Sequence, residues 1–255
     1  MPDLSGKAAI VTGCASGIGA ATVRRLVADG AQVLGTDLNA EAGQALCDEV
    51  GAQFLQQDVA DEARWEEVVS AAVETFGRLD ILVNNAGTVS SRSIGEVDMA
   101  AWSRVIAVNL TGTMLGCRAA IDAMVANTGG ASGAIINISS TTAITPLPTD
   151  VGYSASKAGV RALSKSVATW YAQQGHAIRC NTVIPGATDT GILDAAEQVT
   201  PGLKAAVAAT SPMNRLADPA ETAAAIAFLA SDECPFMTGA DMLIDGGALS
   251  IHPGF

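Results

Sequence analysis

Short apolar runs alternate with longer amphipathic segments along the chain, and this alternation most limits how the chain can fold. The short runs are apolar at nearly every position, as in strands that are buried on both faces of a parallel sheet. The pattern predicts seven strands, over residues 8–11, 32–36, 53–55, 79–83, 134–138, 178–184 and 242–244.

Helical periodicity fills the intervals between the strands and predicts helices over residues 17–28, 40–50, 61–76, 100–125, 152–173 and 219–230. Such alternation indicates an α/β protein in which right-handed crossovers place helices on both faces of a doubly wound sheet. Because no linker or composition break interrupts the pattern, we expect a single Rossmann-type domain over residues 1–255. Segment 188–212 contains Gly191, Pro201, Gly202 and Pro212 and is weakly periodic, so we expect a mobile loop or helical flap there.

Composition excludes several classes of function. A net charge of −12 argues against a nucleic-acid partner, since phosphate backbones are bound by clustered Lys and Arg. No apolar run reaches the length of a membrane span, and the N-terminus lacks a signal-peptide pattern, so we expect a cytoplasmic protein without a membrane partner. The five scattered cysteines resemble reduced thiols. His176 and His252 are the two histidines, far apart in sequence, and no metal site is expected.

A glycine-rich turn follows the first predicted strand. Segment 12–19 reads Thr-Gly-Cys-Ala-Ser-Gly-Ile-Gly and runs directly into a helical pattern. Glycines let the backbone approach a pyrophosphate, whose charge is stabilised by the free N–H groups of the helix N-terminus. The spacing differs from the usual dinucleotide fingerprint, and a glycine-rich turn without a ligand is the alternative.

Asp37 ends the second predicted strand, eighteen residues after Gly19. An acidic side chain at this place accepts hydrogen bonds from the adenosine ribose of NAD and repels the 2′-phosphate of NADP. No Arg or Lys flanks it, which also favours NAD. The alternative is that Asp37 is the N-cap of the next helix.

Tyr153 and Lys157 are four residues apart in a helical segment, so they share a helix face. Acid/base work near pH 7 requires the tyrosine pKa to fall from about 10, which takes about 4 kcal/mol of differential stabilisation of the phenolate. A nearby cation supplies part of this. A solvated helix face is the alternative for the pair on its own.

Further motifs follow in a fixed order: Asn-Asn-Ala-Gly at 84–87, Asn109, a serine pair at 139–140, and Pro-Gly at 185–186. With the glycine-rich turn and the tyrosine and lysine pair, these motifs closely resemble the short-chain dehydrogenase/reductase family over nearly the whole chain. Segments around His176 and Ala230 are similar to those of bacterial hydroxysteroid and alicyclic alcohol dehydrogenases.

The resemblance implies a role for each motif residue. Tyr153 would be the general acid/base, and Lys157 would lower its pKa and hold the nicotinamide ribose. Ser140, thirteen residues before the tyrosine, would donate a hydrogen bond to the substrate oxygen, with Ser139 as the competing candidate. Asn109 would hold a water that links the lysine to solvent, and an interhelical hydrogen bond is the alternative for this residue.

The same resemblance implies an NAD site, for which turn chemistry is the alternative explanation of the Asn, Gly and Pro residues. Besides Tyr153 and Lys157, its residues would be Gly13, Ser16, Gly17, Ile18, Gly19, Asp37, Asp58, Val59, Asn85, Ala86, Gly87, Pro185, Gly186, Thr188 and Thr190.

The predicted function is NAD-dependent interconversion of a secondary alcohol and its ketone. Segments 141–151, 188–212 and 251–255 would form a pocket with few charges, so we expect a neutral, hydrophobic, cyclic or aryl-bearing substrate. A 3-oxoacyl thioester reductase is one alternative, and a non-catalytic nucleotide-sensing protein is another. By resemblance, helices 100–125 and 152–173 would pair between subunits in a homotetramer.

Overall fold

Seven strands pair in parallel in the computed structural model, which describes residues 2–250. The strand order is β3-β2-β1-β4-β5-β6-β7, so the order reverses between β1 and β4. The predicted doubly wound sheet is confirmed. Its strands are β1 (Ala8–Thr12), β2 (Gln32–Asp37), β3 (Gln53–Gln56), β4 (Ile81–Asn84), β5 (Ser132–Ile138), β6 (Ala177–Pro185) and β7 (Asp241–Ile244).

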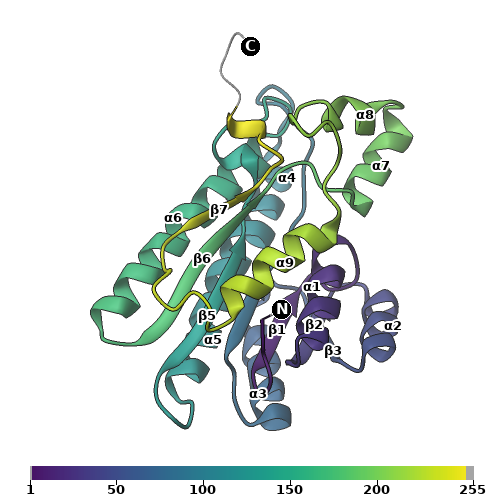
Figure 1. Cartoon of the computed structure of the whole chain (residues 1–255). Helices are drawn as coiled ribbons and strands as arrows, with labels where there is room; N and C mark the ends of the chain where they lie inside the picture. The colour runs from purple at the N-terminus through teal and green to yellow at the C-terminus, as the bar shows by residue number, and fades with distance from the viewer. Residues whose placement is uncertain (1, 251–255) are drawn as a thin grey trace.

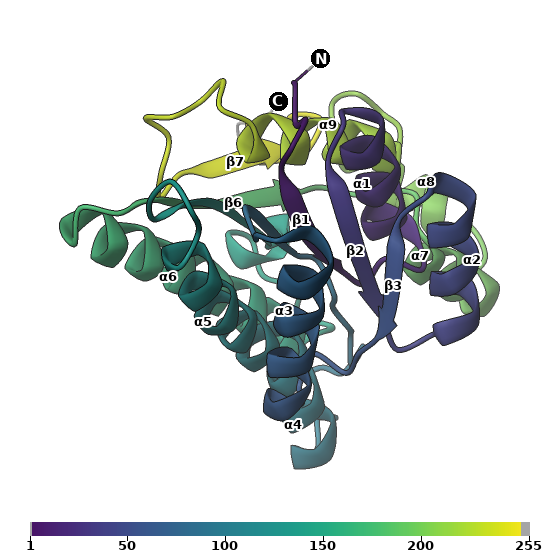
Figure 2. The same cartoon turned by 90° about the horizontal axis from the view of Figure 1, so that it is seen from below.

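Helices cover both faces of the sheet (Figures 1 and 2). One face carries α1 (Gly17–Ala28), α2 (Ala40–Val50) and α9 (Pro219–Ala230). The other carries α3 (Glu62–Phe76), α4 (Met99–Ile106), α5 (Gly112–Val125) and α6 (Val151–Gln173). Several of these helices begin at an N-cap side chain that accepts a backbone N–H, as Asp61 does for α3.

Two apolar cores result from the alternation of side chains along each strand. Ala9 and Val11 of β1 belong to the core beneath α1 and α9, whereas Ile10 between them belongs to the core beneath α3 and α5. All three side chains are fully buried. Burial on both faces explains why central strands such as β1 and β4 are apolar at nearly every position and do not alternate with polar residues.

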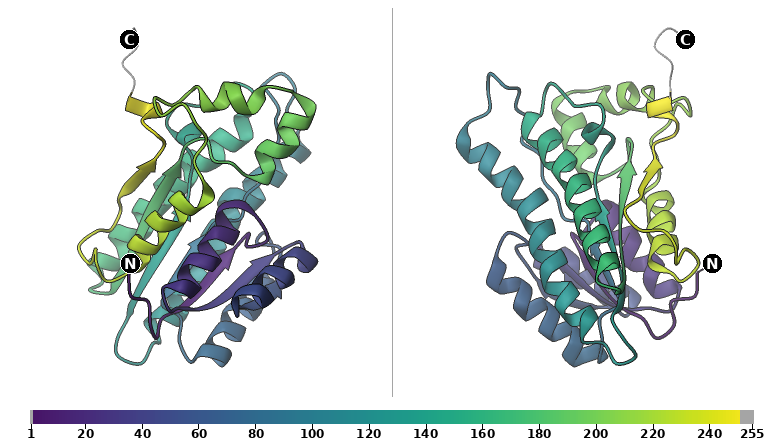
Figure 3. Two further views of the ribbon diagram at one scale, coloured as in Figure 1. Left: turned by 45° about the vertical axis from the view of Figure 1, so that its right-hand side comes forward. Right: turned by 90° about the vertical axis from the view of Figure 1, so that its left-hand side faces the viewer.

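Two segments differ from a simple helix or loop. The helix predicted over 100–125 is divided by a π-helical segment, Ala107–Thr111, between α4 and α5. Within segment 188–212 lie two short helices, α7 (Gly191–Val199) and α8 (Leu203–Ala208), beyond the carboxyl ends of the strands (Figure 3). The helical alternative for this flap is therefore confirmed.

Short 3-10 turns follow β5 at Thr141–Ala143 and β7 at Ala248–Ser250. The predicted pocket segment 251–255, with His252, lies outside the described residues. Across residues 2–250, no helix has the length and apolarity that crossing a membrane requires.

Candidate active site

The glycine-rich turn after β1 meets the end of β4 at the place where the strand order reverses. In doubly wound sheets ligands bind at this switch point. A Cβ atom on Gly19 would lie 2.0 Å from the carbonyl oxygen of Gly13 and 2.6 Å from Nδ2 of Asn85. That amide nitrogen donates to the carbonyls of Thr12 (2.9 Å) and Gly13 (3.1 Å). Only glycine fits at position 19 without displacing this junction.

Asp37 lies at the end of β2, beside the glycine-rich turn. Its two carboxylate oxygens accept backbone N–H groups from Ala15 (3.0 Å) and Asn39 (2.9 Å). The N-cap of α2 is Asn39, whose side chain accepts the N–H of Ala42. Asp37 is therefore not the cap of α2.

The other predicted cofactor residues also lie at the carboxyl ends of strands. Asp58 is exposed after β3, whereas Val59 is buried. Ala86 donates its N–H to Thr12 Oγ1, 3.0 Å away, and Gly87 follows it. Ser16 is the N-cap of α1, with no side-chain cap hydrogen bond, and Ile18 packs on the first core.

Segment 185–190 brings a further strand end to the same region. Pro185 ends β6, and the Thr188 hydroxyl donates to the carbonyl of Gly186, 3.2 Å away. The Cγ2 of Thr190 lies 3.1 Å from the position that a Cβ on Gly17 would take. The start of the flap is therefore packed against the glycine-rich turn.

Ser140, Tyr153 and Lys157 come together at the start of α6. The Ser140 hydroxyl accepts the N–H of Thr142 (3.2 Å), so its own proton is available, and it is within hydrogen-bonding reach of the Tyr153 phenol. The Lys157 ammonium lies 5.6 Å from the centre of the Tyr153 ring. The Ser139 hydroxyl instead donates to the backbone carbonyl of Lys157 (2.8 Å), which leaves Ser140 as the serine that faces the tyrosine.

Burial dominates the pKa values of this cluster. It raises the pKa of the Tyr153 phenol above its ordinary value, while the hydrogen bond with Ser140 opposes that rise and the Asp150 carboxylate adds to it. Burial also lowers the pKa of Lys157 to about 8. Burial therefore shifts the phenol pKa in the direction opposite to the one that a neighbouring cation would give.

Lys157→Met is expected to stabilise the cofactor-free chain at neutral pH. A fall of the Lys157 pKa from 10.5 to about 8 corresponds to a folding penalty of about 3 kcal/mol when the amine is protonated in both states. Because the folded-state pKa is the lower one, this penalty is complete below the folded-state pKa and disappears as pH rises past the unfolded-state pKa. The bond from Lys157 Nζ to the Ile138 carbonyl (2.8 Å) is lost in the variant and offsets part of the gain.

Urea unfolding of both proteins measures the effect. We expect a gain of about 2 kcal/mol at pH 7, after subtracting about 1 kcal/mol for the lost hydrogen bond. The gain should shrink as pH rises toward 11. A gain that is independent of pH would contradict an electrostatic origin.

Asn109 lies in the π-helical segment and is fully buried. Its side-chain amide binds both backbone groups of Thr88, at 2.8 and 2.9 Å, and donates to Ser156 Oγ at 3.0 Å. A Cβ on Gly87 would stand 3.5 Å from both Asn109 Oδ1 and Lys157 Nζ, so these groups lie around the same small space. The interhelical hydrogen bond anticipated as an alternative is present, here with Ser156 of α6.

Sequence reasoning missed Asp150 and Arg215. Asp150 is the N-cap of α6, and its side chain accepts the N–H of Tyr153. Asp three residues before the tyrosine was a readable cap signal. Arg215 lines a cavity of about 240 Å³ beside Thr141, Gly186 and Met213, where it forms an ion pair with Glu221. No local pattern reveals the second case, because the cavity joins segments distant in sequence.

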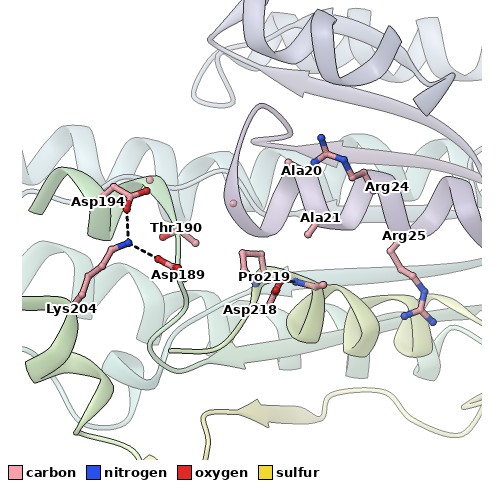
Figure 4. Close-up of a pocket in the computed structure, with 13 residues that line it drawn as sticks. Ala20, Ala21, Arg24, Arg25, Asp189, Thr190, Asp194, Lys204, Asp218 and Pro219 are labelled. Carbon is pink, nitrogen blue, oxygen red and sulfur yellow. Dashed lines mark hydrogen bonds and ion pairs between the residues drawn. The ribbon is translucent and has the colours of Figure 1, made fainter. Parts of the chain in front are cut away.

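A larger cavity, of about 660 Å³, lies between α1, the start of the flap, α8 and the start of α9 (Figure 4). Across it, the Lys204 ammonium pairs with Asp189 (2.7 Å) and Asp194 (2.5 Å) of the flap. On α1, Arg24 pairs with Glu49 and Arg25 pairs with Asp29. Each cation that lines the cavity is thus paired with a carboxylate of the chain, and the two ion pairs of Lys204 join α8 to the start of the flap.

Comparisons with known proteins agree with this geometry. A family model described as enoyl-(acyl carrier protein) reductase matches residues 13–248. The chain is 39% identical over 249 residues to 2,5-dichloro-2,5-cyclohexadiene-1,4-diol dehydrogenase of Sphingobium indicum, covering 96% of each chain. It is 40% identical over 259 residues to 3beta-hydroxysteroid dehydrogenase 1 of Eggerthella lenta, covering 99% of this chain and 97% of the relative.

A third relative is cis-4-hydroxycyclohexanecarboxylate dehydrogenase of Sinomonas cyclohexanicum, 42% identical over 250 residues. That alignment covers 96% of this chain and 97% of the relative. All three relatives are named as dehydrogenases, and each alignment spans the glycine-rich turn, the tyrosine and lysine pair and the flap.

Proposed function

The chain belongs to the short-chain dehydrogenase/reductase family and is an alcohol dehydrogenase with a nicotinamide cofactor, and we propose that it interconverts cyclic secondary alcohols and ketones with NAD. The observation that carries this proposal is the convergence of Ser140, Tyr153 and Lys157 beside the junction of β1 and β4. A hydroxyl donor, an acid/base and a cation are the groups that oxidation of an alcohol requires.

The residues at the strand ends fit a dinucleotide. Gly13 and Gly19 lie too close to Asn85 and Ala86 at the end of β4 for either to carry a side chain. The backbone N–H groups at the start of α1 would bind the pyrophosphate. Asp37 would hold the adenosine ribose, and Lys157 would hold the second ribose, since its bond to Ile138 leaves two N–H groups of the ammonium. The oxidised nicotinamide supplies a hydride acceptor and a positive charge.

In the proposed mechanism Tyr153 moves the proton. During oxidation Tyr153 takes the hydroxyl proton of the alcohol in its phenolate form, which the positive charges of Lys157 and of the bound oxidised cofactor would stabilise against burial. The alcohol carbon loses hydride and becomes a carbonyl. Ser140 donates its free O–H to the substrate oxygen and stabilises the alkoxide character that develops there. Lys157 and Asn109 lie around the space above Gly87, from which a water would relay the proton onward. Reduction runs through the same groups in reverse.

Two observations support a cyclic, largely apolar substrate. The relatives above are named for ring substrates: a cyclohexadienediol, a hydroxysteroid and a hydroxycyclohexanecarboxylate. In this chain Ile144, Leu147 and Met213 expose apolar side chains near the site, while the charges of Arg215 and Glu221 neutralise each other. These features favour a ring packed by dispersion contacts over a charged chain.

A panel of alcohols tests the proposal. Cyclohexanols, hydroxysteroids and 3-hydroxyacyl thioesters would each be supplied with NAD or NADP, and the absorbance of reduced nicotinamide would be followed. We expect turnover of ring alcohols with NAD. Turnover confined to the thioesters, with NADP, would favour a thioester reductase and contradict the proposal.

Asp37→Ala is expected to lower the preference for NAD. The variant loses charge-assisted bonds to the ribose, which are worth about 1.5–3 kcal/mol, and no longer repels a 2′-phosphate. The ratio of kcat/KM with NAD to kcat/KM with NADP should fall at least about tenfold, because 1.4 kcal/mol is a factor of ten. The control is Asp48→Ala, which removes an exposed carboxylate of α2 that binds Gln44. An unchanged ratio in Asp37→Ala would exclude this role.

We also propose a cytoplasmic homotetramer. The face of α6 that carries Ala155, Ala158 and Ala162 is exposed and small enough for close helix packing, whereas Gly159 packs within the subunit against Leu110. The five cysteines are buried free thiols, as in a reducing compartment. Sedimentation at the monomer mass of 25.7 kDa would contradict the assembly.

A further inference from the structure

Side chains bind both backbone polar groups of Tyr153, whose N–H lies in the first turn of α6 and has no backbone partner within the helix. Its N–H donates to Asp150 Oδ1 at 3.1 Å, and its carbonyl accepts from Ser156 Oγ at 2.7 Å. Ser156 Oγ in turn accepts from the Asn109 amide, which binds the backbone of Thr88. The position of the tyrosine is thereby connected to the loop that follows β4.

Asp150 makes a second and stronger connection to the same loop. Its carboxylate accepts the N–H of Ser90 (2.9 Å), the hydroxyl of Ser90 (2.6 Å) and the N–H of Ser91 (2.7 Å). The residue is only 4% exposed, and burial of a carboxylate is costly unless it is hydrogen-bonded. The Asp150 carboxylate therefore accepts hydrogen bonds from Ser90 and Ser91 of the loop and from Tyr153 of the helix, and these bonds compensate for its burial.

The backbone at Ser91 shows that the loop is constrained at this place. Ser91 has φ of 52°, in the left-handed region that residues with a side chain rarely adopt. Such a conformation persists where surrounding contacts fix it, and the N–H of Ser91 is bound by Asp150. The carboxylate thus holds an unfavourable turn against the first turn of α6.

We propose that Asp150 is a positioning residue for Tyr153, which acts by clamping the turn at Ser90 and Ser91 onto the N-terminus of α6. This proposal rests on the proposed function, because it assigns Tyr153 the acid/base role. The clamped turn lies a few residues after Asn85, whose side chain binds the carbonyls of Thr12 and Gly13 in the glycine-rich turn. Asp150 therefore fixes the phenol relative to the cofactor side of the site.

The charge of Asp150 gives the clamp a second effect. Burial acts to raise the pKa of this carboxyl, but hydrogen bonds from Ser90, Ser91 and Tyr153 outweigh burial and hold the pKa below its ordinary value. The carboxylate therefore stays ionised at neutral pH, and its charge raises the pKa of the Tyr153 phenol.

Other charged groups lie on the elements around the start of α6, and several are paired elsewhere. Arg104 donates to the Val89 carbonyl, and Glu96 accepts from Ser93. Those on α6 are Lys157, Arg161 and Lys165, and those on the loop after β4, α4 and β7 are Arg92, Glu96, Asp98, Arg104 and Asp241. Arg161 and Asp241 pair with each other.

Asp150→Asn tests the clamp. The amide oxygen of the variant can still accept the Tyr153 N–H. Its NH₂ group then faces the N–H groups of Ser90 and Ser91 and cannot accept hydrogen bonds from them. We expect kcat for alcohol oxidation to fall roughly tenfold, with NAD affinity within about twofold. The apparent pKa in the pH profile of kcat/KM should move down, because a negative charge beside the phenol is removed.

A direct titration separates this proposal from the proposed function. The chain has two tyrosines, so a Tyr171→Phe background leaves Tyr153 as the single phenol. Its ionisation can be followed by ultraviolet absorbance without substrate or cofactor. A downward shift on Asp150→Asn would show that the Asp150 carboxylate acts on Tyr153, even if Tyr153→Phe retains turnover, which would defeat the proposed function alone.

Asp98→Asn is the matched control, since Asp98 is the N-cap of α4 and accepts the Ala101 N–H. It should change neither kcat nor the Tyr153 titration. If Asp150→Asn does not fold, Ser90→Ala removes the hydroxyl bond alone and should lower kcat about twofold to threefold. Lower thermal stability with unchanged kcat and unchanged Tyr153 titration would overturn the proposal and leave Asp150 a simple helix cap.

Discussion

Tyr153→Phe should lower kcat for alcohol oxidation by about a thousandfold while NAD still binds. Proton transfer by a positioned side chain contributes about 10²–10⁴ in rate, and the phenyl ring has no group that can accept the hydroxyl proton. The ring itself is retained, so its packing beside the Lys157 ammonium is preserved. Steady-state kinetics with a ring alcohol, together with NAD binding followed by tryptophan fluorescence, measure both quantities.

Tyr171→Phe is the matched control for this substitution. Tyr171 lies near the end of the same helix and packs against His176, with ring centres 5.9 Å apart. Removing its hydroxyl should leave kcat unchanged. If Tyr153→Phe also keeps its turnover, the acid/base is another group and the mechanism is wrong. If Tyr153→Phe loses NAD binding as well, the substitution has damaged the site and Ser140→Ala becomes the informative variant.

Gly19→Ala should both destabilise the chain and abolish tight NAD binding. The added Cβ would lie 2.0 Å from the Gly13 carbonyl oxygen and 2.6 Å from Asn85 Nδ2, and the first of these is backbone that cannot rotate away. Overpacking of this kind costs about 1–3 kcal/mol of stability. To relieve the clash, the backbone must move, and this movement separates the glycine-rich turn from the end of β4. We expect a loss of about 3 kcal/mol in the free energy of unfolding and at least about a tenfold rise in the Kd for NAD.

Gly95→Ala controls for the added methyl group. Nothing lies within 4 Å of the position that a Cβ on Gly95 would take, and its backbone is outside the left-handed region. Urea unfolding and NAD titration of both variants give the comparison. Normal NAD affinity in Gly19→Ala would show that the close approach at the junction of β1 and β4 does not shape the cofactor site.

The strands and most helices were predictable because their signals are local. A strand buried on both faces is apolar at nearly every position, as β1 is. A helix such as α3 begins after an N-cap, Asp61, and ends at a left-handed glycine, Gly77, and both residue types can be recognised in the sequence. The π-helical segment around Asn109 has no such signal. Its backbone geometry accompanies bonds from the Asn109 side chain to Thr88 and Ser156, which are distant in sequence.

By itself the sequence determined the sheet, the family and the residues that gather at the strand ends, because periodicity and motif spacing are properties of short stretches of chain. The tertiary structure alone decided how those residues act on one another. Burial raises the pKa of Tyr153 where helical spacing to Lys157 predicted the reverse, since desolvation depends on everything packed around a group. Likewise the four bonds of Asp150 join a loop and a helix sixty residues apart, a contact that folding creates and no local pattern records.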